Sequence, residues 1–286
     1  MASSDRELPP HRLAAVIGSP VAHSLSPAIH RAAFNAAGVD WSYVAFDVEP
    51  GSASEALAAM RALGIGGLSV TMPHKTDMAR LVDRLDPAAA ALHTVNTVSW
   101  DGDQLVGSST DGAGFVASLI DAGVEIAGAR VAVIGAGGAA RSVIDALARA
   151  GAPGITVLNR SHDRAEQAAA LAPAATVGIV TDVSRADIVV NATSVGMGVA
   201  PAEAGDDDLP CPPELLHAGH IVADLVYHPL ETAWLQRAAD LGATTVDGLG
   251  MLVHQAALQQ RIWLGDDAVI DTTAMRLAAE AALAAS

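Results

Sequence analysis

The sequence predicts an α/β protein of two domains, and three observations lead to this fold class. Apolar strand-like runs alternate with helix-like segments from end to end, the order typical of a mainly parallel sheet. The length of 286 residues corresponds to about two domains at ~150 residues each. Hydrophobic residues make up 51% of the chain and charged residues 17%, which excludes a disordered or fibrous chain and supplies apolar material for two cores.

The first alternating series occupies the N-terminal part of the chain. We expect strands at residues 13–17, 41–48 and 68–71, helices at 27–37 and 55–63, and a hairpin of strands 96–100 and 104–109. The first helix has clear boundary signals, because Ser26 is a good N-cap, Pro27 suits the first helical position and Gly38 follows the end.

A second alternating series begins at Arg130. Its expected strands are residues 131–134, 155–158, 176–180, 187–191, 221–226 and 243–246, with helix-length segments between most of them. Residues 250–285 are expected to be helical. The segment 200–213 contains prolines and an acidic run, so we expect a surface loop there.

The chain is strongly acidic, with 32 Asp and Glu against 16 Lys and Arg and a formal net charge of −16. Such a surface repels phosphate backbones and anionic lipids, so we expect neither a nucleic-acid nor a membrane partner. Cys211 is the single cysteine, which excludes an internal disulfide, and we expect no metal site. Residues 1–12 lack the apolar core of a secretory signal, and no apolar run approaches membrane-spanning length, so we expect a cytoplasmic protein.

The strongest motif is a glycine-rich turn after the strand at 131–134. Gly135, Gly137 and Ala140 occupy the G-x-G-x-x-G/A positions directly before an amphipathic helix. Gly135 allows the tight turn, Gly137 lets the backbone approach a pyrophosphate, and the helix N-terminus supplies free N–H groups. This pattern predicts a Rossmann-type, doubly wound dinucleotide-binding domain; the alternative is a tight turn without a ligand.

The residues after the next strand favour NADP over NAD. An NAD-binding unit places an acidic residue there for the ribose hydroxyls, whereas this chain has Asn159 and Arg160, with Arg164 close behind. A guanidinium can pair with a 2′-phosphate that a carboxylate would repel. The alternative is that Arg160 is a solvated loop charge.

Polar residues also mark several points in the first domain. Ser24 and Ser26 lie beside a helix N-terminus and together suit a carboxylate, although capping alone accounts for Ser26. Lys75 lies in the first turn of the helix that Pro73 begins, where the helix dipole lowers the pKa of an amine and suits it to acid/base work. The alternative is an exposed lysine with little penalty.

Three further polar residues lie where the pattern predicts apolar or capping residues. Asn96 lies inside an expected strand, and Asp111 ends the hairpin as either a helix cap or a carboxylate partner of Lys75. Gln255 shares a helical stripe with Met251, Leu258 and Ile262, so it is either a satisfied buried amide or a group that faces substrate.

Together these residues resemble the shikimate dehydrogenase family over nearly the whole chain. The matching motifs are GSPVAHSLSP at 18–27, SVTMPHK at 69–75, VNT at 95–97, TDG at 110–112, GAGGAAR at 135–141, NR at 159–160, NATSVGM at 191–197, DLVYHP at 224–229 and GLGMLVHQ at 248–255. So many short motifs in the same order are highly specific.

The resemblance implies an N-terminal α/β substrate domain and a Rossmann-type NADP-binding domain with a cleft between them. The substrate domain would comprise residues 1–112, completed by the C-terminal helices at 250–286, and the NADP domain would comprise 113–249. The implied reaction is the reversible, NADPH-dependent reduction of 3-dehydroshikimate to shikimate in aromatic amino-acid biosynthesis.

The family's functional residues carry over onto matching positions. Ser24 and Ser26 would hold the substrate carboxylate, and Lys75 and Asp111 match the catalytic pair. The residues that would line the ring hydroxyls are Thr71, Lys75, Asn96, Asp111, Tyr227 and Gln255. The cofactor-binding positions are Gly135, Ala136, Gly137, Gly138, Ala139, Asn159, Arg160, Arg164, Thr193, Leu225 and Gly248.

The chain departs from the family pattern at three points near the expected ring site. The family usually has Asn at the position of Ser69, Gly-Ala at His93-Thr94, and Asn at Ser109. The alternative functions are therefore a quinate/shikimate or aminoshikimate dehydrogenase with broader substrate or NAD use, and, more remotely, a non-catalytic NADP-sensing module. We expect a small-molecule partner, and the sequence leaves a monomer and a homodimer equally open.

Overall fold

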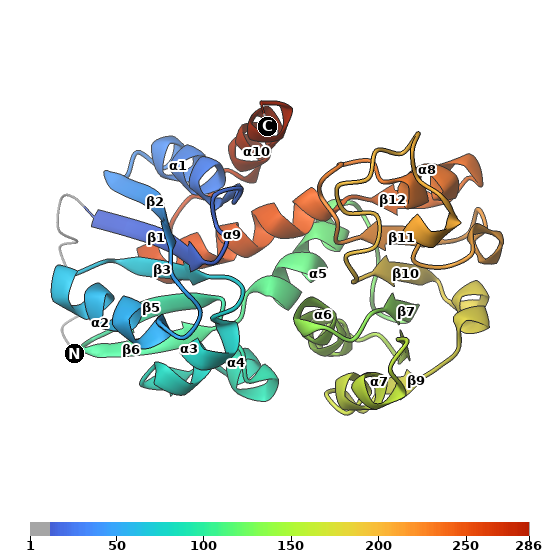
Figure 1. Ribbon diagram of the computed structural model, residues 1–286, viewed down its shortest axis with the longest axis horizontal. Helices are drawn as coiled ribbons and strands as arrows, with labels where there is room; N and C mark the ends of the chain where they lie inside the picture. Colours follow the sequence, from blue (N-terminus) through green and yellow to red (C-terminus); the bar gives the residue numbers. More distant parts are fainter. Residues whose placement is uncertain (1–11, 286) are drawn as a thin grey trace. The chain divides into compact units, whose positions relative to one another are not determined.

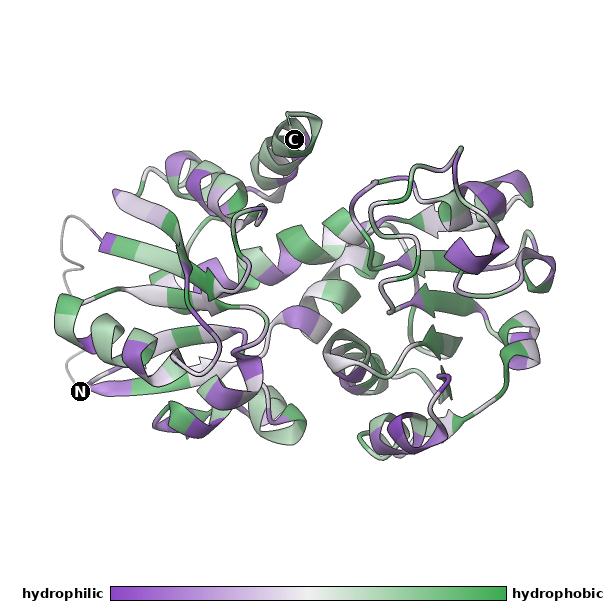
Figure 2. Ribbon diagram, viewed as in Figure 1, coloured by the Kyte–Doolittle hydropathy of each residue, from purple (hydrophilic) through white to green (hydrophobic). Residues whose placement is uncertain are grey.

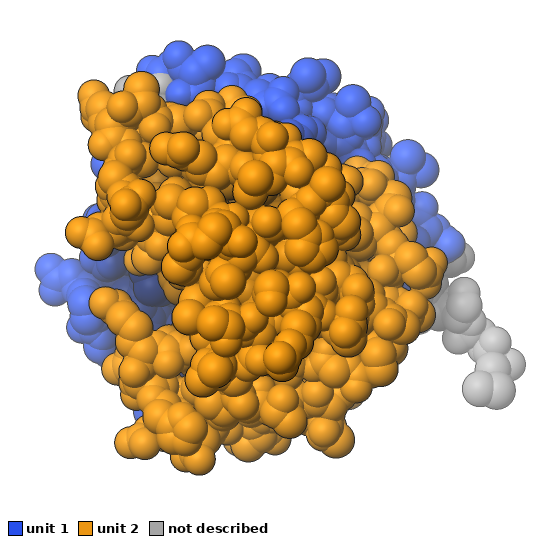
Figure 3. Space-filling view, turned by 90° about the vertical axis from the view of Figure 1, so that its right-hand side faces the viewer, with its two compact units in different colours: residues 1–86, 94–108, 259–286 blue, residues 87–93, 109–258 orange. Residues whose placement is uncertain are grey.

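The computed structural model describes residues 12–285, so the expectation for the segment before residue 12 lies outside the described residues (Figure 1). The chain divides into two compact units (Figure 3). Unit 1 contains the described residues up to Asp86, Thr94–Ser108, and the residues from Gln259 onward. Unit 2 contains Pro87–His93 and Ser109–Leu258.

Unit 1 is built on a six-stranded sheet in the order β2-β1-β3-β5-β6-β4. Its elements are β1 (Arg12–Gly18), α1 (Ser26–Ala36), β2 (Trp41–Asp47), α2 (Ala53–Leu63), β3 (Gly67–Val70), α3 (Lys75–Leu81), β4 (Arg84–Leu85), β5 (Thr97–Asp101), β6 (Gln104–Ser108), the end of α9 (Gly248–Leu264), and α10 (Thr272–Ala284). The sheet is mixed, because the hairpin β5–β6 makes β5 antiparallel to β3 while β1, β2 and β3 run parallel.

Unit 2 is built on a six-stranded parallel sheet in the order β12-β11-β10-β7-β8-β9. Its strands are β7 (Arg130–Ile134), β8 (Gly154–Leu158), β9 (Ala175–Val177), β10 (Ile188–Asn191), β11 (Ile221–Asp224) and β12 (Thr244–Val246). Its helices are α4 (Pro87–Leu92), α5 (Asp111–Asp121), α6 (Gly138–Arg149), α7 (His162–Ala169), α8 (Ala233–Asp240) and most of α9, with short 3₁₀ turns Val180–Arg185, Asp206–Asp208 and Pro213–Leu215. Numbered from β7, the order is 3-2-1-4-5-6, that of the dinucleotide-binding fold.

The central strands of unit 2 are apolar on both faces, as a sheet covered by helices on both sides requires (Figure 2). Val131 and Val133 of β7 join the core formed with α5, α6 and α7, whereas the intervening Ala132 packs with Trp234 of α8 on the other face. This alternation confirms the doubly wound architecture expected from the sequence.

Three expected boundaries are wrong in detail. The helix α1 already includes Ser26, and its N-cap is Leu25, because the Ser24 side chain accepts a hydrogen bond from the Ser26 amide at 3.3 Å. Asn96 precedes β5 instead of lying within it, although its backbone pairs with both neighbouring strands. The strand expected at 176–180 ends at Val177, because Asp182 Oδ2 accepts from the Ile179 amide and begins a 3₁₀ turn.

Two expectations about the C-terminal half are also corrected. The segment 200–213 contains a short 3₁₀ turn and brings Cys211 into the core beside Trp234, so it is not wholly a surface loop. The helix α9 begins at Gly248, since Asp247 caps it through the amides of Leu249 and Gly250. Its buried residues are Leu249, Val253, Gln255, Ala256, Ala257, Gln259, Gln260 and Trp263, whereas Ile262 of the expected stripe is 38% exposed.

Within residues 12–285 no helix is long and apolar enough to cross a membrane. The same residues contain no cluster of three or more His, Cys, Asp or Glu side chains that could hold a metal ion.

Candidate active site

The substrate-site candidates of unit 1 lie at one edge of its sheet. The parallel strands β1 and β3 end there together, as the hydrogen bond from the Thr71 amide to the Ile17 carbonyl (2.9 Å) shows. The antiparallel β5 starts at this edge, where the Val70 amide donates to the carbonyl of Asn96 at 2.7 Å. Segments 18–26, 71–75 and 95–96 are therefore brought to one edge, although the sequence separates them by up to 78 residues.

Lys75 is the first residue of α3 and is half-buried. Its carbonyl accepts a hydrogen bond from the Val95 amide at 2.9 Å, which fixes the start of α3 beside the segment that carries Asn96. The preceding His74 is fully buried, and its Nε2 donates to the carbonyl of Val48 at 2.7 Å. These contacts hold the backbone from which the lysine side chain extends.

The two serines near the start of α1 make different contacts, and the one that accepts a helix amide is Ser24 and not Ser26. Ser24 is half-buried and receives the Ser26 amide, so Ser24 satisfies the helix N-terminus. Ser26 is buried, and its hydroxyl interacts with the phenol of Tyr43 and lowers the pKa of that phenol, although burial raises this pKa more strongly. Capping therefore accounts for Ser24, and Ser26 belongs to a buried polar network.

In unit 2, the glycine-rich turn has the geometry that a dinucleotide needs. Gly135 has φ +121°, and a Cβ there would lie 2.8 Å from the carbonyl oxygen of Ala192 at the end of β10. Gly137, Gly138 and Ala139 are exposed at the N-terminus of α6. A Cβ at Gly137 or Gly138 would meet nothing within 4 Å, so the backbone borders open space that a pyrophosphate can occupy. These residues fit a dinucleotide.

The candidate phosphate-reading residues follow β8. Asn159 is half-buried, and its Nδ2 donates to the carbonyl of Ser161 at 2.9 Å. Arg160 and Arg164 are exposed, and within residues 12–285 neither guanidinium has a hydrogen-bond or ion-pair partner. By contrast, Arg130 and Arg149 each pair with an aspartate. In a chain of net charge −16, two arginines without a carboxylate partner suit an anionic ligand.

The remaining cofactor candidates follow the carboxyl ends of β10, β11 and β12. Thr193 is held by Asn191, whose Oδ1 accepts from the Thr193 amide (3.1 Å) and hydroxyl (2.7 Å). Leu225 lies against Gly248, where a Cβ would be 2.5 Å from the Leu225 carbonyl oxygen. Tyr227, a substrate candidate on the same loop after β11, is half-buried, and burial raises its pKa. All the cofactor candidates thus lie at the carboxyl edge of the sheet, where this fold binds its ligands.

A buried carboxylate that sequence reasoning missed supports these loops. Asp224, the last residue of β11, is 2% exposed. Its Oδ1 accepts from Asn191 Nδ2 (2.8 Å) and the Val226 amide (3.0 Å), and its Oδ2 accepts from the Thr232 hydroxyl (2.8 Å). Burial is the main influence and raises the pKa of Asp224 to about 6, whereas the three hydrogen bonds lower it. The sequence did contain a signal for this buried carboxylate, because Asp224 follows the apolar residues of β11 directly.

Asp111 and Gln255 both belong to unit 2. Asp111 is the first residue of α5, where the helix dipole favours its carboxylate. Gln255 lies on α9, which packs closely on α5, because a Cβ at Gly114 would be 2.6 Å from the Gln255 amide nitrogen. The side-chain amide of Gln255 donates to the Leu252 carbonyl in its own helix at 2.9 Å.

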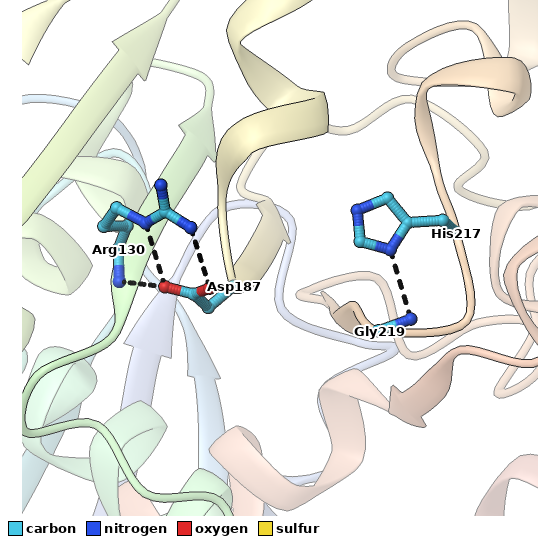
Figure 4. Close-up of polar contacts among 4 residues, drawn as sticks. All are labelled: Arg130, Asp187, His217 and Gly219. Carbon is cyan, nitrogen blue, oxygen red and sulfur yellow. Dashed lines mark hydrogen bonds and ion pairs between the residues drawn. The ribbon is translucent and has the colours of Figure 1, made fainter.

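The opposite, amino-terminal edge of the unit 2 sheet carries a structural ion pair (Figure 4). The Arg130 guanidinium donates to Asp187 Oδ2 from Nε (3.2 Å) and to Oδ1 from a terminal nitrogen (3.1 Å), while the Arg130 amide also donates to Oδ2 (2.8 Å). Nearby, His217 Nδ1 accepts from the Gly219 amide at 3.1 Å. This pair joins the starts of β7 and β10, away from the cofactor candidates.

The 3-2-1-4-5-6 sheet, the glycine turn at its central crossover and the unpaired arginines define unit 2 as the dinucleotide-binding part of an α/β enzyme. Three family descriptions match the chain: the shikimate dehydrogenase substrate-binding domain at residues 16–98, shikimate/quinate 5-dehydrogenase at 118–204, and the shikimate 5′-dehydrogenase C-terminal domain at 248–277. The chain belongs to the shikimate dehydrogenase family. This confirms the resemblance and the fold class expected from the sequence.

Individual relatives agree with this assignment. The shikimate dehydrogenase (NADP(+)) of Moorella thermoacetica is 44% identical over 269 residues, 90% of each chain. The structure is similar to that of shikimate 5-dehydrogenase from Thermus thermophilus in complex with NADP(H) and shikimate, with a TM-score of 0.86, 34% identity and coverage of 95% and 99%. It is also similar to a quinate dehydrogenase from Corynebacterium glutamicum in complex with NAD, with a TM-score of 0.84, 30% identity and the same coverage.

Proposed function

We propose that this protein is an NADP-dependent oxidoreductase that reversibly reduces 3-dehydroshikimate to shikimate in aromatic amino-acid biosynthesis. The relative that is 44% identical carries the name shikimate dehydrogenase (NADP(+)), and Lys75 and Asp111 lie at the positions where the resemblance places the catalytic pair. Bound NADPH supplies the hydride. The protein's own residues must bind the ring, hold its carboxylate and provide the proton that the new hydroxyl requires.

The observation that carries the proposal is the identity of residue 75. Lys75 is the single lysine of the chain, whose other fifteen Lys-plus-Arg positions are all arginine. An arginine keeps its proton at any physiological pH, whereas an ammonium can give up a proton and recover it. A lone lysine at the start of α3, beside the segment that carries Asn96, is therefore the residue suited to proton transfer in unit 1.

The proposed chemistry is a balanced proton transfer. When hydride reaches the ring ketone, the carbonyl oxygen becomes an alkoxide, and the Lys75 ammonium donates a proton to it and becomes a neutral amine. In the oxidation direction, the amine removes the hydroxyl proton. We assign Asp111 the role of the carboxylate that orients the ammonium, and Ser24, Ser26, Thr71, Asn96, Tyr227 and Gln255 the binding of substrate.

The first experiment measures initial rates with shikimate and with quinate, each with NADP and with NAD. A strong preference for shikimate with NADP is the expected result. Appreciable turnover of quinate or NAD would instead favour a broad-specificity dehydrogenase, for which the similarity to a quinate dehydrogenase provides the precedent. Ser69, His93 and Ser109 would then be the first positions to exchange.

The second experiment replaces Lys75 by arginine and by alanine. Lys75→Arg keeps the positive charge, but a guanidinium holds its protons too tightly to give one to the alkoxide, so both variants should lose a factor on the order of 10²–10⁴ in kcat with little change in the KM for shikimate. An arginine variant with near-normal turnover would contradict the proton-transfer role. Because the chain has no other lysine, reductive ¹³C-methylation labels just Lys75 and the N-terminal amine, which allows direct measurement of the Lys75 pKa by NMR.

A further inference from the structure

One buried glutamine of α9 has its hydrogen-bonding capacity filled by groups next to the candidate substrate residues of unit 1. Gln259 is 1% exposed. Its Oε1 accepts from the Ser69 hydroxyl (2.7 Å) and lies 3.1 Å from His30 Nε2. Its Nε2 donates to the Asn96 carbonyl (3.1 Å) and the Thr97 hydroxyl (2.9 Å). Two acceptor sites and two N–H groups are thus all used.

The Asn96 carbonyl fixes the orientation of this amide. A carbonyl can only accept, so Gln259 Nε2 must face it and Oε1 must face Ser69 and His30. His30 therefore carries its proton on Nε2, and its Nδ1 accepts from Gln260 Nε2 at 3.1 Å. Complete burial lowers the pKa of His30 to about 3, so the ring stays neutral at physiological pH.

The same orientation determines which atom of the Asn96 side chain faces the protein. The Thr97 hydroxyl oxygen accepts a hydrogen bond from Gln259 Nε2, so the hydroxyl itself donates to Asn96 Oδ1 at 2.8 Å. Gln259 thereby holds the Asn96 backbone directly and the Asn96 side-chain oxygen through Thr97. Asn96 is buried, so a rotated amide would place a polar atom without its partner.

On its other side, Gln259 contacts Ser69, one of the positions at which the chain departs from the expected family pattern. The Ser69 hydroxyl donates a hydrogen bond to Gln259 Oε1, and the Ser69 oxygen accepts one from the Tyr43 hydroxyl at 2.7 Å. The His30 ring stacks on Tyr43 with a centroid separation of 4.3 Å. The Ser69 hydroxyl therefore serves the internal network that continues through Tyr43 toward Ser26.

We propose that Gln259 is a positioning residue for substrate binding. It holds Asn96 in the orientation that binds a ring hydroxyl, and it does so from α9, without touching substrate itself. This role rests on the proposed function, because it assumes that Asn96 contacts the ring. Sequence reasoning pointed to Gln255 on the same helix and missed Gln259.

The test compares two neighbouring glutamines. Gln259→Leu removes all four contacts, so the KM for shikimate should rise by about tenfold or more, with a smaller change in kcat and an unchanged KM for NADP. The matched control is Gln260→Leu, since Gln260 is 0% exposed and bonds to the same His30 but has no contact with Asn96. Both variants should lower Tm, and the control should keep the wild-type KM for shikimate.

A second variant separates positioning from stability if Gln259→Leu does not fold. Gln259→Glu keeps the shape, but one carboxyl oxygen then faces the Asn96 carbonyl and must be protonated to donate. The KM of this variant for shikimate should therefore rise with pH relative to wild type, which a purely structural role does not predict. Thr97→Val removes the hydroxyl that links Gln259 to Asn96 Oδ1 but keeps the bond from Gln259 to the Asn96 carbonyl, so it should raise the KM by a smaller factor.

The wild-type rate measurements come first, so the two hypotheses fail separately. A wild-type protein without shikimate turnover overturns the proposed function and this role with it. If the wild-type protein oxidises shikimate, the Gln259 variants test the role of Gln259 alone. That role is overturned if they keep the wild-type KM for shikimate at every pH, or change it no more than Gln260→Leu does.

Discussion

The buried carboxylate of Asp224 should give the protein a measurable dependence of stability on pH. Its three hydrogen-bond donors, on Asn191, Val226 and Thr232, are all neutral, so no cation among them offsets the loss of hydration. The pKa of Asp224 is about 6 in the folded protein against an ordinary value of 3.8. At 1.36 kcal/mol per pKa unit, ionisation of this group costs about 3 kcal/mol of stability at neutral pH.

The sign follows from the direction of the shift. Because the folded pKa lies above the unfolded one, the folded protein binds more protons between these values, and stability falls as pH rises through about 6. Between pH 5 and pH 7 the stability of the folded protein should fall by about 1 kcal/mol because of Asp224. Asp224→Asn keeps the shape and the acceptor oxygen but cannot ionise, so it removes this dependence.

The assay is urea unfolding of wild type and Asp224→Asn, followed by far-UV circular dichroism at constant ionic strength from pH 5 to pH 7.5. The free energy of unfolding of the variant, minus that of wild type, should increase by about 1 kcal/mol from pH 5 to pH 7. Loss of the hydrogen bond from Thr232 changes the unfolding free energy of the variant by the same amount at every pH. Titrating groups that both proteins share, such as His30, contribute equally to both and cancel in the difference. The control is Asp187→Asn, because hydrogen bonds from Arg130 lower the pKa of Asp187, which keeps it below the assay range. The difference in unfolding free energy between this variant and wild type should therefore not change with pH. A flat or falling difference for Asp224→Asn would refute the reasoning.

Three other predictions concern the cofactor residues and two positions with positive φ. Arg160→Ala should raise the KM for NADP about 10- to 100-fold and leave the KM for NAD unchanged. Replacement of Arg237, an exposed arginine of α8, by alanine should alter neither KM. Equal losses for NADP and NAD in the Arg160 variant would show that Arg160 does not bind the 2′-phosphate. Gly135→Ala should cost about 2 kcal/mol or more of stability because of its φ of +121° and the Ala192 carbonyl, whereas Gly138→Ala should fold normally and bind NADP more weakly, as thermal unfolding and initial rates would show. His93→Gly should stabilise the protein by about 0.5–1 kcal/mol in urea unfolding, because His93 has φ +52°; a destabilised variant would contradict this.

The position of His93 shows how a family pattern and a backbone angle agree. The resemblance leads us to expect glycine there, and His93 has a left-handed backbone, with φ +52°, which glycine adopts without the steric cost of a side chain. The sequence alone identified the departure but not its cause, since φ depends on how the chain turns after α4 toward Asn96.

The candidate site was predicted in its parts because each part is a local signal. The glycine turn and the ends of β8 and β10 depend on residues within a few positions of one another, and the structure places each where the pattern indicated. The helix α3 begins at Lys75 and not at Pro73, and β11 ends at Asp224, two residues before its expected end. The hydrogen bond from the Ser26 amide to the Ser24 hydroxyl was not predicted, because side-chain capping depends on a contact that spacing alone does not decide.

The sequence by itself determined the alternation of strands and helices, the dinucleotide turn, the single lysine and the family to which the chain belongs. The tertiary structure alone decided which distant polar residues meet: Gln259 with His30, Ser69 and Asn96, and Asp224 with Asn191 and Thr232. Local pattern acts over one helical turn or one strand period, whereas these contacts depend on which strands are neighbours and which helix covers them. A buried polar group must find partners wherever the packing places it, so its partners become known only when the fold is complete.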